Sequence, residues 1–300
     1  MKRSSSLLVL ACVLGIAPAS RAEGIPVTTC AVTIPAGQQG VLQNDVTCVN
    51  RCTLDPDVLC SPGDDEGVCG DGVCRAETLK LEAGAQLDLA GHTITMALHG
   101  DGVVCLGPAG NAGRCTVTGP GIFNGAKGAA IASADADLVV ANVTIGQCDD
   151  AITTRGRLTA TGLVTESGRE NTIQALGGVR LRHAVIAGDY GIVTDGDVRV
   201  TDVDLSAPGG IQAGGRVRGR DLRLSRNADV RGRDVALRGV TVTTEPFVQP
   251  PVLVAERTLR LLDSSVAGIE SGKRPQLPRT TCDTSTVFGT SSSWGVCSGD

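Results

Sequence analysis

An eight-residue pattern of apolar and polar positions recurs along the chain. Segments of this length align without gaps at nine places, with starts 18 to 28 residues apart. Positions 1 and 8 are almost always apolar, and positions 3 and 6 are mostly so. Within each half, apolar residues alternate with polar ones, which is the period of a half-buried strand, but the phase shifts between positions 3 and 6. Each segment therefore predicts two short strands with a bend between them. The segments are LDLAGHTI from 87, CTVTGPGI from 115, LVVANVTI from 138, LTATGLVT from 158, VRLRHAVI from 179, VRVTDVDL from 198, VRGRDLRL from 217, VALRGVTV from 235 and LRLLDSSV from 259.

Position 5 of the segment is where the strand direction changes. It holds almost only residues that tolerate a positive φ or turn easily. These residues are Gly91, Gly119, Asn142, Gly162, His183, Asp202, Asp221, Gly239 and Asp263. We therefore expect a one-residue bend in each unit. The same register places Val200 and Leu205 inside the molecule, with Arg199 and Thr201 outside.

The repeated units predict a stacked architecture. After each pair of strands, we expect a looser return of roughly a dozen residues, which often begins the next turn with Ile131, Ile152, Ile192 or Ile211. One unit cannot bury its apolar face alone, whereas parallel units stacked ~4.8 Å apart bury continuous apolar columns. The sequence thus predicts an all-β fold, a single-stranded parallel β-helix of about nine or more coils. The preference of parallel crossovers makes it right-handed.

The start of the chain also resembles a known group of proteins. The run CAVTIPAG from Cys30, the run VLQNDVTC that ends at Cys48 and the segment from Leu87 are similar to the opening of bacterial secreted right-handed β-helix repeat proteins. That group shares its fold with pectate lyases. The resemblance covers most of residues 27–270 and implies the fold, but the fold hosts lyases, hydrolases, epimerases and adhesins alike.

The first 22 residues have the features of a signal peptide. A basic start is followed by an apolar stretch from Leu7 to Ala17, which is too short to span a bilayer, and by small residues suited to cleavage. No later segment is long and apolar enough for a membrane helix. We expect an exported protein that is secreted, periplasmic or held at the cell surface. Its predicted parts are a signal peptide (1–22), a Cys-rich N-terminal cap (23–77), a β-helix (78–268) and a C-terminal cap or tail (269–300).

Eleven cysteines remain after the predicted cleavage, and six of them lie between positions 30 and 74. In an exported chain without zinc-ligand spacing, they predict disulfide bonds rather than a metal site. Cys105–Cys115 and Cys282–Cys297 are the expected local bridges, and Cys148 is the candidate for the odd thiol. The disulfide candidates are Cys30, Cys48, Cys52, Cys60, Cys69, Cys74, Cys105, Cys115, Cys282 and Cys297.

The amino-acid composition favours some classes of function over others. The 300 residues include 40 Gly and only five aromatic residues. Enzymes that act on glycans usually hold sugar rings on aromatic side chains, so this scarcity favours a non-catalytic protein. The same scarcity, with the net charge of -5, argues against nucleic acid as a partner.

Charge is unevenly distributed along the chain. Residues 23–150 hold 5 basic and 16 acidic side chains, whereas residues 151–240 hold 14 arginines, no lysine and 10 acidic side chains. The alignment places Arg180, Arg199, Arg218 and Arg260 at outward position 2, and Arg182, Arg220 and Arg238 at outward position 4. Stacked coils would bring many of these into a stripe. Two interpretations remain open: pairing with Asp202, Asp204 and Asp221, or binding of an acidic polysaccharide.

Few other residues indicate chemistry. The pair Asp149 and Asp150 is similar to the paired aspartates of polygalacturonases, but the companion motifs are absent, and we expect a solvated turn there. His92 is expected to be a packed or capping side chain. His99 with Asp101 could form a small polar site, and His183 is a further bend residue. The acidic residues Asp64, Asp65, Glu66 and Asp71 could offer oxygen ligands to calcium, although they lack the EF-hand pattern. No other cofactor is expected.

Two classes of function follow. The first is an exported, non-catalytic scaffold or a module that binds an acidic polysaccharide or a cell-surface glycan. The alternative is a polysaccharide lyase or glycoside hydrolase acting on uronate-containing glycans. The resemblance to pectate lyases implies that an arginine would then abstract a proton beside a metal-neutralised uronate.

Overall fold

The computed structural model describes ten stretches of the chain and contains strands and loops only. The sequence expectations for residues 1–23, His99 and the acidic residues between 64 and 71 fall outside these stretches. The described residues are 24–48, 50–52, 68–69, 72–76, 78–96, 101–107, 113–168, 171–225, 227–243 and 252–300.

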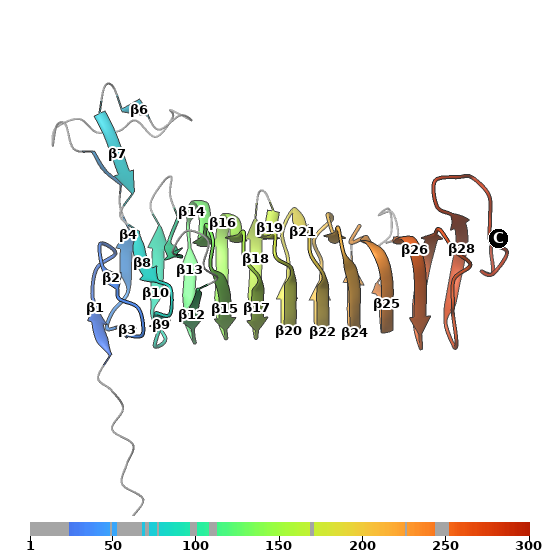
Figure 1. Cartoon of the computed structure of the whole chain (residues 1–300), viewed down its shortest axis with the longest axis horizontal. Coiled ribbons are helices and arrows are strands. Elements are labelled where there is room, and N and C mark those ends of the chain that lie inside the picture. Colours follow the sequence, from blue (N-terminus) through green and yellow to red (C-terminus); the bar gives the residue numbers. More distant parts are fainter. Residues whose placement is uncertain are drawn as a thin grey trace, which may run out of the picture.

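Twenty-five strands form one sheet, in which all the strand pairs are parallel. Successive turns of the chain stack along the long axis of the molecule (Figure 1) and pass through three ladders of hydrogen-bonded strands. The arrangement is compatible with a β-helix-like fold.

The first ladder contains β1 (Ile25–Val27), β3 (Gln39–Leu42), β9 (Gln86–Asp88), β12 (Arg114–Thr118), β15 (Asp137–Ala141), β17 (Leu158–Thr161) and the first parts of β20 (Val179–Ile186), β22 (Val198–Leu205) and β24 (Arg216–Ser225). The second contains β4 (Val46–Cys48), β10 (Thr93–Met96), β13 (Ile122–Asn124), the start of β16 (Thr144–Thr154), β18 (Val164–Gly168) and the second parts of β20, β22 and β24. The third contains β2 (Thr33–Ile34), β8 (Leu79–Glu82), β11 (Val103–Leu106), β14 (Ala126–Ser133), the end of β16, β19 (Asn171–Ala175), β21 (Tyr190–Thr194) and β23 (Ile211–Ala213). Near the C-terminus, β25 (Val230–Thr243), β26 (Val252–Leu262), β27 (Ser265–Ser271) and β28 (Thr281–Val287) each extend through more than one ladder.

The third ladder is more regular than the sequence suggested. We expected a loose return, but the isoleucines there are register partners from turn to turn and are fully buried. Their column consists of Ile131, Ile152, Ile173, Ile192 and Ile211. Loop lengths between the segments vary, which hides this third strand from an ungapped alignment.

The predicted bends are confirmed at eight of the nine places. The residue at position 5 has a positive φ in every segment except the one from 115, with values from 49° at His183 to 90° at Gly91. In the segments from 138 onward, a single left-handed residue reverses the alternation of side chains, so that positions 3 and 6 both face inward. In the segment from 87, Ala90 is left-handed as well as Gly91, and His92 at position 6 is only half-buried. Val200 and Leu205 are each 1% exposed, whereas Arg199 is exposed, as predicted.

The register of the first two segments differs from the ungapped alignment. Leu87 pairs with Val117 rather than with Cys115, and Phe123 rather than Ile122 is the partner of Ile94. The bend after Thr118 is one residue longer than in the next coil, so Ile122 points outward and Phe123 is fully buried. Phe123 fits a space that aliphatic residues fill in the other coils.

Three disulfide bonds join described cysteines: Cys30–Cys48, Cys105–Cys115 and Cys282–Cys297. The two predicted local bridges are therefore confirmed. Cys148 is buried and belongs to none of the three. Cys60 lies outside the described residues.

The Cys-rich excursion contains a small second sheet. The strands β5 (Asn50–Cys52), β6 (Val68–Cys69) and β7 (Gly72–Ala76) pair antiparallel, and they lie beside the N-terminal end of the stack in Figure 1. The preceding strands β1 to β4 already belong to the three ladders. The domain boundaries given above remain predictions.

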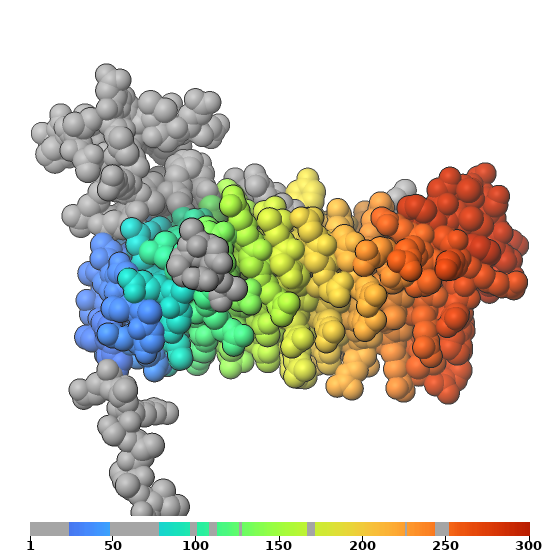
Figure 2. All heavy atoms as spheres, viewed as in Figure 1, coloured from blue at the N-terminus to red at the C-terminus, as the bar shows by residue number. Residues whose placement is uncertain are grey.

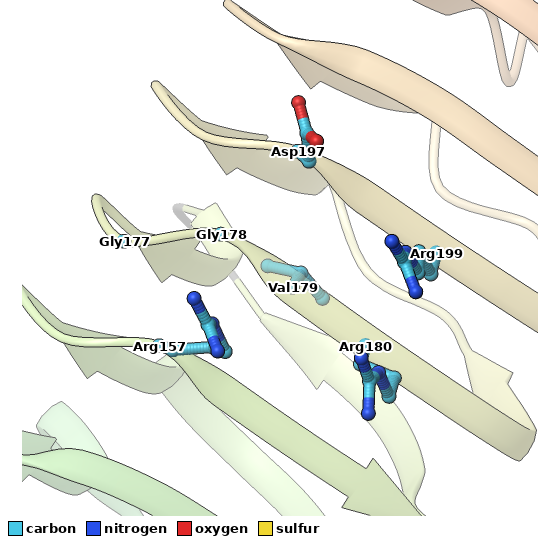
Figure 3. Close-up of a pocket in the computed structure, with 7 residues that line it drawn as sticks. All are labelled: Arg157, Gly177, Gly178, Val179, Arg180, Asp197 and Arg199. Carbon is cyan, nitrogen blue, oxygen red and sulfur yellow. The ribbon is translucent and has the colours of Figure 1, made fainter.

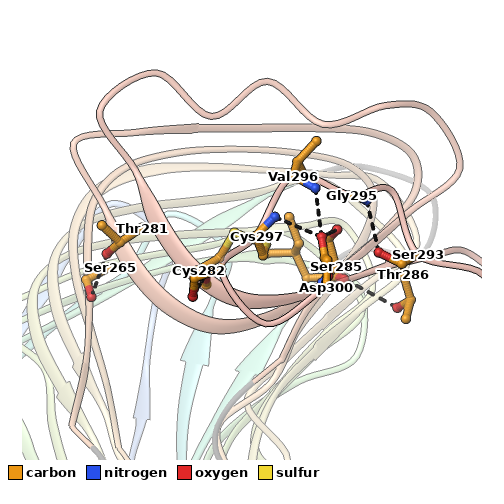
Figure 4. The surroundings of a disulfide bond; sticks show 12 residues. Ser265, Thr281, Cys282, Ser285, Thr286, Ser293, Gly295, Val296, Cys297 and Asp300 are labelled. Carbon is orange, nitrogen blue, oxygen red and sulfur yellow. Dashed lines mark hydrogen bonds between the residues drawn. A yellow bond between two sulfur atoms is a disulfide. The ribbon is translucent and has the colours of Figure 1, made fainter.

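The last turn of the chain closes over the end of the stack. Cys297 is bonded to Cys282 of β28, and the side chain of Asp300 accepts hydrogen bonds from the backbone of Ser285, Val296 and Cys297 (Figure 4). Trp294 donates its indole N–H to the carbonyl oxygen of Ser271 at 3.1 Å. These contacts hold the C-terminal residues against β27 and β28.

Candidate functional site

Three exposed arginines lie next to one another on the outside of the first ladder. Arg180 of β20 is the register partner of Arg199 of β22, which is in turn the partner of Arg218 of β24. Neighbouring strands are ~4.8 Å apart. Since side chains alternate along a strand and the flanking Val179 and Val198 are buried, the guanidinium groups face solvent. Figure 3 shows Arg180 and Arg199 on adjacent strands with this arrangement.

A second row runs parallel to the first at position 4. Arg182, Thr201 and Arg220 are successive register partners, and both arginines are exposed. We call Arg180, Arg182, Arg199, Arg218 and Arg220 together the arginine face. The sequence predicted this grouping, and the strand pairing brings these side chains onto one side of the stack.

Two of the three carboxylates expected to neutralise the arginine face, Asp202 and Asp204, contact other groups, and the third, Asp221, forms no ion pair with a described residue. Asp202 lies 3.0 Å from the guanidinium of Arg223 and 2.9 Å from Nδ1 of His183. Asp204 also pairs with Arg223, on the second ladder. Within the part of the chain that the structure describes, no carboxylate forms an ion pair with any residue of the arginine face, taking 4.0 Å as the limit.

Arg238, the sixth arginine predicted for the site, is different. Its Nε lies 3.2 Å from Oδ2 of Asp263, which also binds Arg279. Hydrogen bonding to Arg279 is the main reason that the pKa of Asp263 is below its ordinary value. Internal pairing thus accounts for Arg238 but not for the arginine face.

The pKa values of the paired groups follow from the same contacts. Hydrogen bonds from His183 and then from Arg223 lower the pKa of Asp202, while Asp204 and Asp202 raise the pKa of Arg223. Asp202 and Arg223 are therefore both charged at neutral pH and are paired with each other. Their neighbours on the arginine face keep their charge exposed.

A shallow pocket of about 250 Å³ lies at one end of the first row. Arg157, Arg180 and Arg199 line it together with Asp197, and Gly177 and Gly178 form part of its wall (Figure 3). Asp197 already accepts the backbone N–H of Arg216 at 2.8 Å. The described lining has three positive side chains and one negative one, which favours an anion.

A larger hollow of about 500 Å³ lies toward the C-terminal end of the same face. It surrounds Ala236, which occupies position 2 between Arg218 and Arg260. The other lining residues include Arg216, Arg257, Lys273 and Arg274. Arg260, one of the arginines predicted for the outward positions, therefore lies beyond the gap in the row.

Sequence reasoning missed most residues of these two hollows. Arg157 and Arg216 each precede position 1 of a segment and were left out of the repeat, and Lys273 and Arg274 follow the last aligned segment. Ala236 carried a usable signal, because it stands where four other segments have arginine. The one segment in this part of the repeat that lacks the arginine therefore marks the position of the hollow.

The other candidate residues do not assemble a site among the described residues. His92 is about one-third exposed and its Nδ1 lies 3.4 Å from Asp45, in agreement with a capping role. Asp101 accepts the N–H of Ala129 at 3.0 Å, and burial raises its pKa. The expected turn at Asp149 and Asp150 is wrong, because both are half-buried within β16. Because the third ladder is continuous in this coil, the two residues belong to a strand and not to a turn.

The described residues contain neither a metal-binding cluster nor a membrane helix. Over the described ranges, no cluster of three or more His, Cys, Asp or Glu side chains is arranged to hold a metal ion. Nor does the described part of the chain contain a helix with the length and apolar character that crossing a membrane requires.

Comparisons of the chain with family models, with curated proteins and with solved structures found no significant match. The site must therefore be interpreted from its own chemistry. Exposed guanidinium groups in rows bind extended anions, because each can make two parallel hydrogen bonds to a carboxylate, sulfate or phosphate. The stack is elongated (Figure 2), which suits a ligand that lies along it.

Proposed function

We propose that this protein binds an acidic polysaccharide along the arginine face. The observation that carries the proposal is the row of Arg180, Arg199 and Arg218, which are exposed, adjacent in register and without a carboxylate partner among the described residues. Like charges ~4.8 Å apart repel one another. A polyanion relieves this repulsion, which favours binding of an extended chain with regularly spaced charges.

We further propose that the stack is a right-handed parallel β-helix of the pectate-lyase-like type. Each turn of the chain passes through the first, second and third ladders in that order, and parallel crossovers are right-handed in nearly all proteins. The three disulfide bonds fit an oxidising compartment. We therefore propose an exported, non-catalytic role as a scaffold or binding module at a surface.

The test uses two triple variants with the same change of net charge. The first is Arg180→Gln, Arg199→Gln and Arg218→Gln; the control is Arg223→Gln, Arg231→Gln and Arg279→Gln, whose arginines are exposed but paired with carboxylates. We expect the first triple to weaken binding of polygalacturonate at low salt by at least tenfold, or ~1.4 kcal/mol. The control should bind within about threefold of the unmodified protein, and the affinity of the latter should fall as salt is added.

Two results would contradict the proposal. Equal losses in the two triples would mean that only net charge matters, and an absence of binding to acidic polysaccharides at low salt would remove the function altogether. The assay should also record the absorbance of unsaturated sugar products. Turnover that disappears with one arginine would favour the lyase alternative over a binding module.

A further inference from the structure

The first row of arginines is interrupted at one coil. Arg218 of β24 pairs in register with Ala236 of β25, and Ala236 pairs with Arg260 of β26. Ala236 ends at Cβ, where its neighbours on both sides extend long side chains. The hollow of about 500 Å³ opens at this place, so the interruption produces a recess with arginines on both sides.

The recess is strongly positive. Of the described residues in its lining, six are cationic and only Asp234 is acidic, which gives these side chains a formal charge of +5. The cationic residues are Arg216, Arg218, Arg257, Arg260, Lys273 and Arg274.

The single carboxylate does not neutralise this charge. Asp234 accepts a hydrogen bond from Thr258 at 2.6 Å, and the Nε atoms of Arg216, Arg233 and Arg257 each lie 3.9 Å from one of its oxygens. One negative charge is thus shared at long distance by three guanidinium groups.

The remaining cations of the lining have no such partner. Among the described residues, no carboxylate lies within 4.0 Å of the charged groups of these four side chains, which are Arg218, Arg260, Lys273 and Arg274. They come from three levels of the stack, with Arg218 on one side of Ala236 and the other three on the opposite side, so their donors reach the recess from different directions.

This arrangement differs from the pocket beside Arg180. There the volume is about half as large, and three arginines face one aspartate. Donors that converge from several directions suit an anion with three terminal oxygens on a tetrahedral centre, whereas a planar carboxylate presents two. A recess, unlike the open row, also accepts a group that projects from the main chain of a polymer.

We propose that the recess at Ala236 is a subsite for a pendant tetrahedral oxyanion, a sulfate or phosphate ester carried by the polysaccharide. This inference rests on the proposed function and specifies its ligand. The arginine face contacts the charges along the polymer, and the recess selects chains that carry such esters.

The experiment compares three polymers with one backbone: dextran sulfate, dextran phosphate and carboxymethyl dextran at equal degrees of substitution. We expect the protein to bind at least one of the two esters about tenfold more tightly than carboxymethyl dextran at low salt. Which ester is preferred identifies the source of the oxyanion. Binding of carboxymethyl dextran alone would support the proposed function and overturn the subsite, and binding of none would overturn both.

The decisive variants fill the recess. Ala236→Leu adds bulk without charge, and Ala236→Arg adds bulk and completes the row. In both variants, the ratio of the affinity for the preferred ester to the affinity for carboxymethyl dextran should fall to about one. The Ala236→Arg variant should bind carboxymethyl dextran at least as tightly as the unmodified protein does. If the recess were only a region of positive potential, Ala236→Arg would strengthen binding of all three polymers, which would overturn the proposal.

Matched controls come from the same column. Thr159 is the register partner of Arg180 and does not line either hollow. Thr159→Leu and Thr159→Arg should leave the preference for the ester unchanged. Arg260→Gln with Arg274→Gln removes two exposed donors without filling space. This variant should reduce the preference at least threefold, and an unchanged preference would count against the subsite even if the Ala236 variants failed to fold.

Discussion

At the scale of single residues, the bend between the first and second ladders carries conformational strain. Among the described residues, seven that are not glycine have a left-handed backbone there, at φ values between 49° and 55°. Asn or Asp occupies four of these places, because their short side chains tolerate this region better than others do. The seven residues are Ala90, Asn142, His183, Asp202, Asp221, Asp263 and Arg279.

A pair of substitutions at Asp221 tests this strain. Asp221 has a φ of 55° and is exposed. Asp221→Val should lower the free energy of unfolding by about 1–2 kcal/mol, because a β-branched residue is poorly accommodated there. Asp221→Gly removes the same carboxylate but should change stability by less than about 0.5 kcal/mol. Thermal unfolding measures both, and an equal loss in the two variants would show that the carboxylate rather than φ matters.

Individual bend residues could be predicted from the sequence, but their exact spacing could not. A turn former at every position 5 is a strong signal, since few residues adopt a positive φ without cost. The added residue in the bend after Thr118 leaves no such signal, because Ile122 and Phe123 are both apolar. Only packing against Ile94 and Ile145 decides that Phe123 is the buried one.

At the scale of elements, the C-terminal turn depends on one carboxylate. Burial disfavours the charged form of Asp300, but hydrogen bonds from Ser285, Cys297 and Val296 outweigh it and hold the pKa well below the ordinary value. A carboxylate with a lowered pKa stabilises the folded state above its unfolded pKa, near 3.8 here. This contribution is lost as the pH falls through the lowered value.

Asp300→Asn should therefore matter at neutral pH and not in strong acid. We expect the variant to melt at a lower temperature than the unmodified protein at pH 7, since the amide is a weaker acceptor for three backbone N–H groups. The difference should shrink below pH 3.8 and approach zero as Asp300 itself is protonated. A difference in Tm that stays constant from pH 7 to pH 2 would rule out this role of the charge.

The elements differ in how well the sequence predicts them. The first and second ladders lie within one eight-residue segment, so a short alignment finds them. The third ladder is separated from its segment by loops of variable length. The sequence therefore shows the recurring isoleucines, but it does not show how the strands that carry them pair. The recess at Ala236 depends on residues from three coils and required the structure.

At the scale of the whole molecule, stability is a sum over neighbouring turns. In stacked repeats each unit contacts mainly the units beside it, so a local defect weakens nearby turns first. The disulfides Cys30–Cys48 and Cys282–Cys297 lie near the two ends of the stack. The middle, where the arginine face lies, has no described disulfide bond.

A charge buried in the middle of the stack should show whether the middle turns open before the disulfide-bonded ends. Val200 is 1% exposed, and Val200→Asp should cost about 3 kcal/mol or more because the carboxylate has no partner inside. Arg199→Asp, on the adjacent outward position, should change stability by less than about 0.5 kcal/mol. Hydrogen exchange should show faster opening of β20, β22 and β24 in Val200→Asp, with the disulfide-bonded ends still protected. Uniform loss of protection from end to end would mean that the stack unfolds as one unit.

The middle coils of the stack are equal in length. Val179, Val198 and Val217 are register partners, and each pair is separated by 19 residues of chain. Because these coils are equal in length and each adds one arginine to the first row, inserting or deleting one of them would change that row by a single step without disturbing the rest. If the first row binds a polymer as proposed, the length of ligand that it contacts is set by the number of turns, one step per coil, rather than by the outline of a closed cavity.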